Sequence, residues 1–251
     1  MQALERDNIR LAATVMLIRD TTDGLQVYMV KRPGKGAFPD LHVFPGGKVD
    51  ADDFAPDVTA DLDDAQASKT LGISAGGIRY WVAVVRECFE ECGVLIVNQA
   101  GAPLNRKGLM PEAQLADKRT QILSGELIFS EFLRNHDLTV ACNRLAYFSH
   151  WLTPESAPRR FDTRFFLAAM PSDQEATADT DETAGEHWIE PTQALEMHQQ
   201  GHWQMIEPTI RSLQTLSQYS FVEQALAAVQ EGNHLMPLTP ELQQQGMQTL
   251  R

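Results

Sequence analysis

The sequence is poor in cysteine and in long hydrophobic runs. Its three cysteines, Cys88, Cys92 and Cys142, are a sparse and odd set in 251 residues. A disulfide framework is therefore disfavoured, and reduced thiols in a reducing compartment are expected. No apolar run approaches the ~20 residues that span a bilayer, and the opening segment "MQALERDNIR" lacks the apolar stretch of a secretory signal. These absences predict a soluble, cytoplasmic globular protein.

Positive charge is also scarce. The chain has 21 Lys and Arg against 34 Asp and Glu, which gives a formal net charge of -13. Nucleic-acid surfaces and anionic lipids attract basic proteins, so the charge predicts no nucleic-acid and no membrane partner. A small anionic substrate stays open, because a local cation or metal outweighs the global field within a Debye length of roughly 8 Å.

The pattern of apolar residues predicts both strands and helices. "LAATVMLIRD" from Leu11 and "LQVYMVKR" from Leu25 are typical of strands, and Asp23-Gly24 between them predicts a hairpin. Residues 104–139 have the composition of helices, and "RLAYFSHWLTP" and "RFDTRFFLAAM" are two further strand candidates. Helices are expected again after Glu190-Pro191. This alternation indicates an α/β protein.

The segment "VVRECFEECGVL" crowds three glutamates, Glu87, Glu90 and Glu91, onto a predicted helix that ends at Gly93. At 100° per residue these carboxylates share an arc of about 100°, opposite an apolar face that includes both nearby cysteines. A solvated acidic face is one interpretation, although like charges at this spacing cost a few tenths of a kcal/mol each. Clustered carboxylates also suit a hard divalent ion, which predicts a site for Mg²⁺ or Mn²⁺.

The same residues resemble a known family. "RECFEECGV", from Arg86 to Val94, matches the second half of the Nudix box, R-E-U-x-E-E-x-G-U, at every fixed position. Gly47 and the five residues after it lead to Asp53, where the first half of the box has Glu, and the spacer to Arg86 is longer than in the family. Whether Asp53 replaces that glutamate stays open. "HVFPGGKVD", "TPESAPRRFDTRFF" and "WIEPTQALEMHQQGHWQMIEPT" resemble the branch of peroxisomal-type coenzyme A diphosphatases.

The resemblance implies a Nudix α/β/α sandwich with a mixed β-sheet, helical insertions and a helical C-terminal tail. We expect a Nudix domain over residues 8–220, with insertions at about 54–77 and 102–140. Residues 221–251 are expected to form a helical extension packed on the same domain. The insertion at 54–77 is too short to bury a core of its own.

The resemblance also implies roles for individual residues. Arg86 is expected to orient the box, while Glu87, Glu90 and Glu91 bind Mg²⁺ or Mn²⁺. A further acid is expected from the loop 175–186, where Glu182 is preferred over Glu175, Asp181 and Glu186, and a flexible acidic linker is the alternative for that loop. The residues expected in the substrate site are Gly46 and Gly47, one of whose carbonyls is a candidate metal ligand, and Arg32 and Arg160, through guanidinium–phosphate pairing. The alternative for the two arginines is a charge that keeps a strand end soluble.

The implied function is metal-dependent hydrolysis of a nucleoside diphosphate derivative. Coenzyme A or acyl-CoA is the first candidate, with 3′,5′-ADP and (acyl-)4′-phosphopantetheine as products. One alternative is a Nudix diphosphatase for ADP-ribose, NADH or another dinucleotide, and another is a non-catalytic nucleotide-sensing module. The expected partner is a small-molecule nucleotide, and a homodimer stays open.

Overall fold

The computed structural model describes residues 5–6, 9–34, 40–155, 157, 159–179, 183–234 and 248–250. Within these residues, nine strands form one mixed sheet with the central order β11-β3-β2-β10-β9-β12, while β1 and β5 pair with β2 and β4 pairs with β3. β10 runs parallel to β2, and the other pairs are antiparallel. The strands are β1 (Glu5–Arg6), β2 (Ile9–Thr21), β3 (Gly24–Lys31), β4 (His42–Val43), β5 (Gly46–Lys48), β9 (Ala146–Leu152), β10 (Arg160–Ala169), β11 (Gly185–Ile189) and β12 (Gln248–Leu250).

The predicted hairpin at Asp23-Gly24 is confirmed. β2 and β3 pair from Ile18 with Val27 down to Thr21 with Gly24. Gly24 has a φ of +133°, a region that a residue with a Cβ rarely adopts. The hydroxyl of Thr21 donates a 2.9 Å hydrogen bond to the carbonyl of Gly24 and closes the turn.

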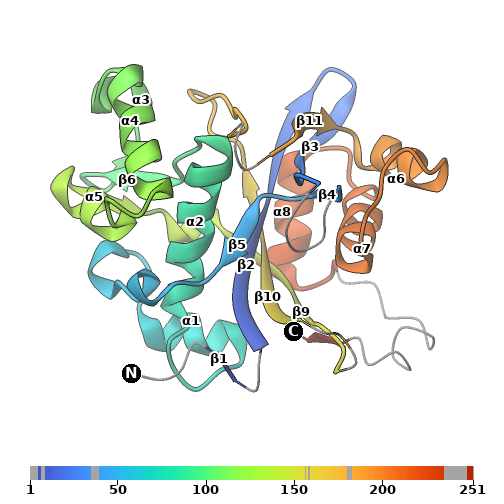
Figure 1. The fold of residues 1–251 in the computed structure, drawn as a ribbon, viewed down its shortest axis with the longest axis horizontal. Helices are drawn as coiled ribbons and strands as arrows, with labels where there is room; N and C mark the ends of the chain where they lie inside the picture. Colours follow the sequence, from blue (N-terminus) through green and yellow to red (C-terminus); the bar gives the residue numbers. More distant parts are fainter. Residues whose placement is uncertain are drawn as a thin grey trace.

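Helices cover both faces of the sheet, as Figure 1 shows, so the expected α/β/α sandwich is confirmed. One layer contains α2 (Ile78–Cys92) with α1 (Asp64–Leu71), α3 (Arg106–Leu109), α4 (Glu112–Leu123), α5 (Phe129–Asn135) and a small sheet of β6 (Val97–Gln99), β7 (Ala102–Pro103) and β8 (Leu138–Val140). The other layer contains α6 (Pro191–Gln199), α7 (Glu207–Leu216) and α8 (Val222–Glu231).

Each layer has its own hydrophobic core against the sheet. Alternation along β2 sends Val15 and Leu17 to the α2 side and Met16 and Ile18 to the side of α6, α7 and α8. Burying both faces of a central strand explains why β2 is apolar over most of its length.

Helix α2 lies against the centre of the sheet and ends where the sequence predicts. Gly93 adopts the left-handed conformation at a φ of 68°, and its N–H donates to the carbonyl of Phe89. Cys88 and Cys92 are fully buried on the apolar face, with their sulfur atoms 3.9 Å apart, so their assignment to core packing is confirmed. The opposite edge of the helix is left for the acidic residues.

Two chain segments outside the central strands pack against the layers described above. Between Phe54 and Gly77, Ala55, Val58 and Leu71 are buried in the α2-side core. The extension expected to be helical over 221–251 is helical in α8, but Gln248–Leu250 form β12 against β9, which corrects the expectation for those three residues. Residues 235–247 of this extension lie outside the described part of the chain. The unpaired backbone groups of an outer strand are a template for such pairing. Among the described residues, no helix combines the length and apolar character needed to cross a membrane.

Candidate active site

Arg86 organises a buried acidic cluster on α2. Its Nη1 donates to Glu87 Oε1 at 2.9 Å and to Glu90 Oε2 at 2.8 Å. Arg86, Glu87 and Glu90 are each at most 8% exposed. The structure therefore brings three of the expected site residues into direct contact, and it excludes a freely solvated acidic face for Glu87 and Glu90.

Asp53 completes this cluster from the turn η1 (Ala51–Asp53). Arg86 Nε donates to Asp53 Oδ1 at 2.9 Å and Nη2 donates to Oδ2 at 3.0 Å, a two-pronged contact with a carboxylate that is 2% exposed. The backbone N–H of Asp50 also donates to Asp53 Oδ2 at 2.7 Å. The long spacer to Arg86 therefore loops out and returns, and Asp53 occupies a position beside Arg86 in space.

Strand β5 brings two glycines against the acidic edge of α2. The N–H of Gly46 donates to Glu91 Oε2 at 2.8 Å. A Cβ on Gly47 would lie 2.5 Å from Glu87 Oε2, and one on Gly46 would lie 2.4 Å from the carbonyl oxygen of Ala13. The lack of a side chain thus lets Gly47 approach Glu87 and lets Gly46 approach β2.

Arg32 reaches the same place from the end of β3. Its Nη2 donates to the carbonyl of Gly46, with a separation of 3.5 Å between the two atoms. The expected substrate contacts Arg32, Gly46 and Gly47 therefore lie together beside Glu91. Arg160 does not join them: it begins β10 opposite Ile9, and its Nε donates to the carbonyl of Thr153 at 3.2 Å.

The electrostatics of the cluster favour a bound cation. Burial raises the pKa of Glu87 well above its ordinary value; Arg86 opposes this shift, while the charges of Glu91 and Glu90 add to it. Burial works against the charge on Arg86, but hydrogen bonds and charge interactions with Asp53 and the two glutamates leave its pKa raised. A divalent ion would stabilise the ionised form of Glu87, because a nearby positive charge favours a carboxylate.

The donor set fits a hard divalent ion that shares its coordination sphere with substrate. Within the described part of the chain, no three acidic, histidine or cysteine side chains are arranged so that they could hold a metal ion by themselves. Glu87 and Glu90 are turned towards Arg86, and Glu91 towards Gly46. Mg²⁺ is commonly bound by one or two carboxylates together with water and substrate phosphate, so an open arrangement of this kind suits it.

The acidic loop before β11 contacts the end of α2. The N–H of Asp179 donates to the carbonyl of Glu91 at 3.0 Å, and the N–H of Thr183 donates to the carbonyl of Asp179 at 3.0 Å. Asp181 and the preferred acid, Glu182, lie outside the described residues, between these two contacts. Glu186 accepts hydrogen bonds from the Tyr28 hydroxyl and the Ala178 N–H, and Glu175 lines a neighbouring pocket.

Sequence reasoning missed Arg119. This residue of α4 donates from Nε to the carbonyl of Glu90 at 2.9 Å and from Nη2 to the carbonyl of Thr177 at 3.1 Å. It therefore links α4, the acidic loop and the C-terminal end of α2. No sequence signal marks it, because an arginine in a helical insertion is typical of a solvated surface.

Comparison with known proteins agrees with this fold. The NUDT19 Nudix domain family model matches residues 74–216, which is more than half of the chain. The structure is similar to a NUDIX hydrolase from Alicyclobacillus acidocaldarius, with a TM-score of 0.72 and 28% identity, covering 87% of this chain and 96% of that one. The fold and the α2 cluster thus define a Nudix protein, and the chain belongs to the NUDT19 Nudix domain family.

Two curated relatives have similar sequences. The human acyl-coenzyme A diphosphatase NUDT19 is 30% identical over 209 residues, which cover 69% of this chain and 56% of that protein. The putative nudix hydrolase 7 of Caenorhabditis elegans is 28% identical over 236 residues, covering 92% of this chain and 68% of that protein. The chain thus spans little more than half the length of the human relative.

Proposed function

We propose that the chain hydrolyses the diphosphate linkage of coenzyme A or acyl-CoA, releasing 3′,5′-ADP and 4′-phosphopantetheine or its acyl form. The observation that carries the proposal is the buried constellation of Arg86, Glu87, Glu90 and Asp53 beside Gly46 and Gly47. The printed activity of the human relative, an acyl-coenzyme A diphosphatase, supports the choice of substrate.

The proposed roles follow from the contacts. Glu87, Glu90 and Glu91 would hold Mg²⁺ or Mn²⁺, which neutralises charge on the phosphoryl oxygens during attack by water. Arg86 and Asp53 hold the carboxylates in place. Gly46 lets β5 lie close to β2 and holds Glu91 through its N–H. Arg32 would offer its guanidinium to a phosphate oxygen beside Gly46. Glu182 stays the preferred further acid.

The experiment offers the purified chain CoA, an acyl-CoA, ADP-ribose and NADH with Mg²⁺ or Mn²⁺ and identifies products by mass. The proposal predicts 3′,5′-ADP and 4′-phosphopantetheine from CoA, and no products after a chelator is added. Faster cleavage of ADP-ribose or NADH than of CoA would instead identify that compound as the substrate. Binding without cleavage of any of the four would favour a nucleotide-sensing module.

Three further features stay predictions alongside this function. Mg²⁺ or Mn²⁺ is the expected ion because the ligands are oxygen atoms. A cytoplasmic location follows from the reduced cysteines and the composition. Whether the chain forms a homodimer can be decided by measuring its molecular mass in solution.

A further inference from the structure

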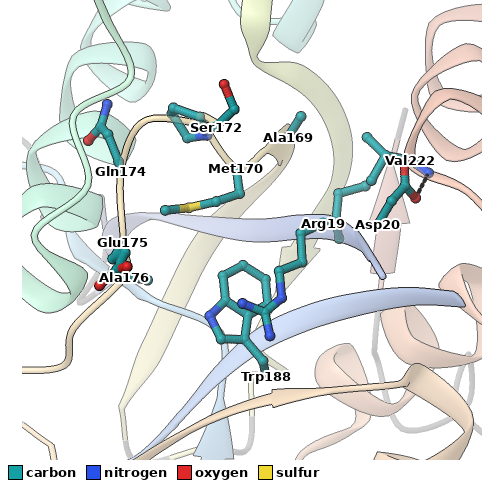
Figure 2. A pocket seen from close by; sticks show the side chains of 12 residues that line it. Arg19, Asp20, Ala169, Met170, Ser172, Gln174, Glu175, Ala176, Trp188 and Val222 are labelled. Atoms are coloured by element: carbon teal, nitrogen blue, oxygen red, sulfur yellow. Dashed lines mark hydrogen bonds between the residues drawn. The ribbon is translucent and has the colours of Figure 1, made fainter. Parts of the chain in front are cut away.

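A pocket of about 590 Å³ lies at the ends of β2 and β10, beside the acidic loop. Its walls include Met170, Ser172, Glu175 and, from β11, Trp188 (Figure 2). The volume lies within the range of roughly 300–1,000 Å³ that is usual for small-molecule sites. None of the residues expected to hold metal or diphosphate lines it, so the pocket is separate from the carboxylate cluster.

Arg19 is held in this pocket as part of a built platform. Its guanidinium lies over the Trp188 ring, with Cζ 4.2 Å from the ring centroid, as Figure 2 shows. Nε and Nη2 both donate to Gln26 Oε1, at 3.1 and 2.8 Å. Among the described residues, Arg19 forms no ion pair within 4 Å. Its position is therefore set by stacking and by one amide, and its charge is available to a ligand.

The charge balance of the pocket favours an uncharged ligand with amide groups. Arg19 is the only cation among the described residues that line it, and Glu175 supplies an opposite charge. Asp20 is already engaged, because its Oδ1 accepts from the Val222 N–H at 2.8 Å. A phosphate would gain one cation but meet Glu175, whereas an amide offers its carbonyl to Arg19 and its N–H to Glu175. Met170 and Trp188 provide surface for aliphatic groups.

The pocket wall continues directly into the candidate active site. After Ala176, the next residues bond to the end of α2: Thr177 N–H donates to the Cys92 carbonyl at 2.9 Å and Asp179 N–H to the Glu91 carbonyl at 3.0 Å. Three residues span about 10 Å at most. A flexible chain of similar length would therefore connect a diphosphate near Glu91 with the pocket.

We propose that this pocket binds the pantetheine arm of the substrate, an uncharged aliphatic chain with two amides. The inference rests on the proposed function, because it assigns the part of coenzyme A that lies beyond the diphosphate. Arg19 and Glu175 would contact an amide, and Met170 and Trp188 would pack on the dimethyl carbon. The pocket would thus distinguish coenzyme A from ADP-ribose and NADH, which have no such arm.

The test uses Ser172→Trp, which places a bulky ring in the pocket from an exposed position, and Arg19→Gln, which removes the guanidinium. Ser124→Trp is the matched control, at an exposed serine on the end of α4 that does not line the pocket. Binding of pantetheine, which has no phosphate, is followed by ligand-observed NMR. The KM and kcat for CoA are measured in parallel.

We expect wild type and Ser124→Trp to bind pantetheine alike. Ser172→Trp and Arg19→Gln should weaken binding and lower kcat/KM for CoA at least ~10-fold, mainly through KM. If wild type cleaves no CoA but binds pantetheine, and the two variants lose that binding, the pocket assignment is supported while the proposed function is refuted. Cleavage of CoA with unchanged KM in both variants would overturn the pocket assignment, as would equal pantetheine binding in wild type and both variants.

Discussion

At the scale of single residues, the three nitrogen atoms of the Arg86 guanidinium link α2 to the turn before it. Nε and Nη2 contact Asp53, Nη1 contacts Glu87 and Glu90, and Nη2 also donates to the carbonyl of Lys48 at 2.7 Å. The arginine thereby offsets the repulsion that the crowded carboxylates would otherwise suffer. It also fixes the direction in which each of them points.

Replacing Asp53 with Asn tests this arrangement. Removing one partner of a buried ion pair costs about 3–5 kcal/mol of stability. The cost of Asp53→Asn should be close to the lower limit of this range or slightly below it, because Arg86 keeps its contacts with Glu87 and Glu90. We expect a loss of roughly 2–3 kcal/mol in the free energy of unfolding, measured with urea, together with reduced turnover. The neighbouring, exposed Asp52→Asn is the control and should change neither quantity. Equal stability of the two variants would contradict the role given to Asp53.

At the scale of elements, the contact between β5 and α2 depends on a missing side chain. A Cβ on Gly47 would lie 2.5–2.7 Å from the carboxyl atoms of Glu87, which Arg86 holds in this position. We expect Gly47→Ala to lose about 1–3 kcal/mol of folding free energy, because Glu87 must move and give up its hydrogen bond with Arg86, and to lose most of its activity. Rates and thermal unfolding measured together separate the two effects.

Gly108→Ala is the matched control for Gly47→Ala. Its Cβ would make only ordinary contacts, the nearest at 3.5 Å to Asn105 Nδ2, and the residue lies in helix α3. Alanine is favoured over glycine in helices, so this variant should keep full activity and equal or greater stability. Full activity in Gly47→Ala would show that the position of Glu87 over β5 is not required.

His42 in strand β4 makes the stability of the folded state depend on pH. This buried ring stacks on Trp203, with centroids 4.0 Å apart and planes inclined by 1°. Burial lowers the pKa of His42 to about 4, and the nearby His187 and Lys31 contribute to the shift. The folded state therefore binds fewer protons than the unfolded state between about pH 4 and pH 6.5.

The consequence is a loss of stability on acidification. The stability that His42 contributes is fully present above pH 6.5 and decreases as the pH falls towards about 4. Wild type should lose roughly 1–3 kcal/mol from this source over that range. His42→Phe keeps an aromatic ring on Trp203 and should show a shallower decline in urea titrations at each pH, whereas exposed His202→Asn should follow wild type. Parallel curves for His42→Phe and wild type would contradict this account.

At the scale of the whole molecule, local patterns predicted the strands and the cluster well. The hairpin at Asp23-Gly24, the apolar face of α2 and its end at Gly93 all follow from short-range periodicity and glycine conformation. The contact of Asp53 with Arg86 could not be predicted with the same assurance, because it depends on how the segment between them returns. Arg119 and β12 depend in the same way on packing between distant segments.

Arg160 illustrates a different limit. The sequence offers a cluster of basic residues, but a strand of ten residues has two ends, and only the sheet register decides which one is near the site. Arg160 pairs with Ile9, whereas Gly47 pairs with Ala13 of the same strand β2. Arg32, by contrast, lies at the end of β3 that meets Gly46. Charge type alone does not distinguish these two arginines.

The central claim is that the carboxylates on α2 are crowded in order to hold a divalent ion for diphosphate cleavage. Glu91→Gln tests it most directly, because the amide oxygen can still accept the Gly46 N–H while the charge is lost. The midpoint temperature of thermal unfolding in the presence of a chelator should be unchanged or slightly higher, since the relief of charge repulsion is worth a few tenths of a kcal/mol. The exposed Glu126→Gln is the control.

The deciding measurement is the turnover of CoA by Glu91→Gln in saturating Mg²⁺. The account predicts a decrease of at least ~10²-fold relative to wild type and to Glu126→Gln, because a lost ligand weakens the ion that stabilises charge in the transition state. Turnover equal to that of wild type would contradict it, because Glu91 would then not be an essential ligand of the ion.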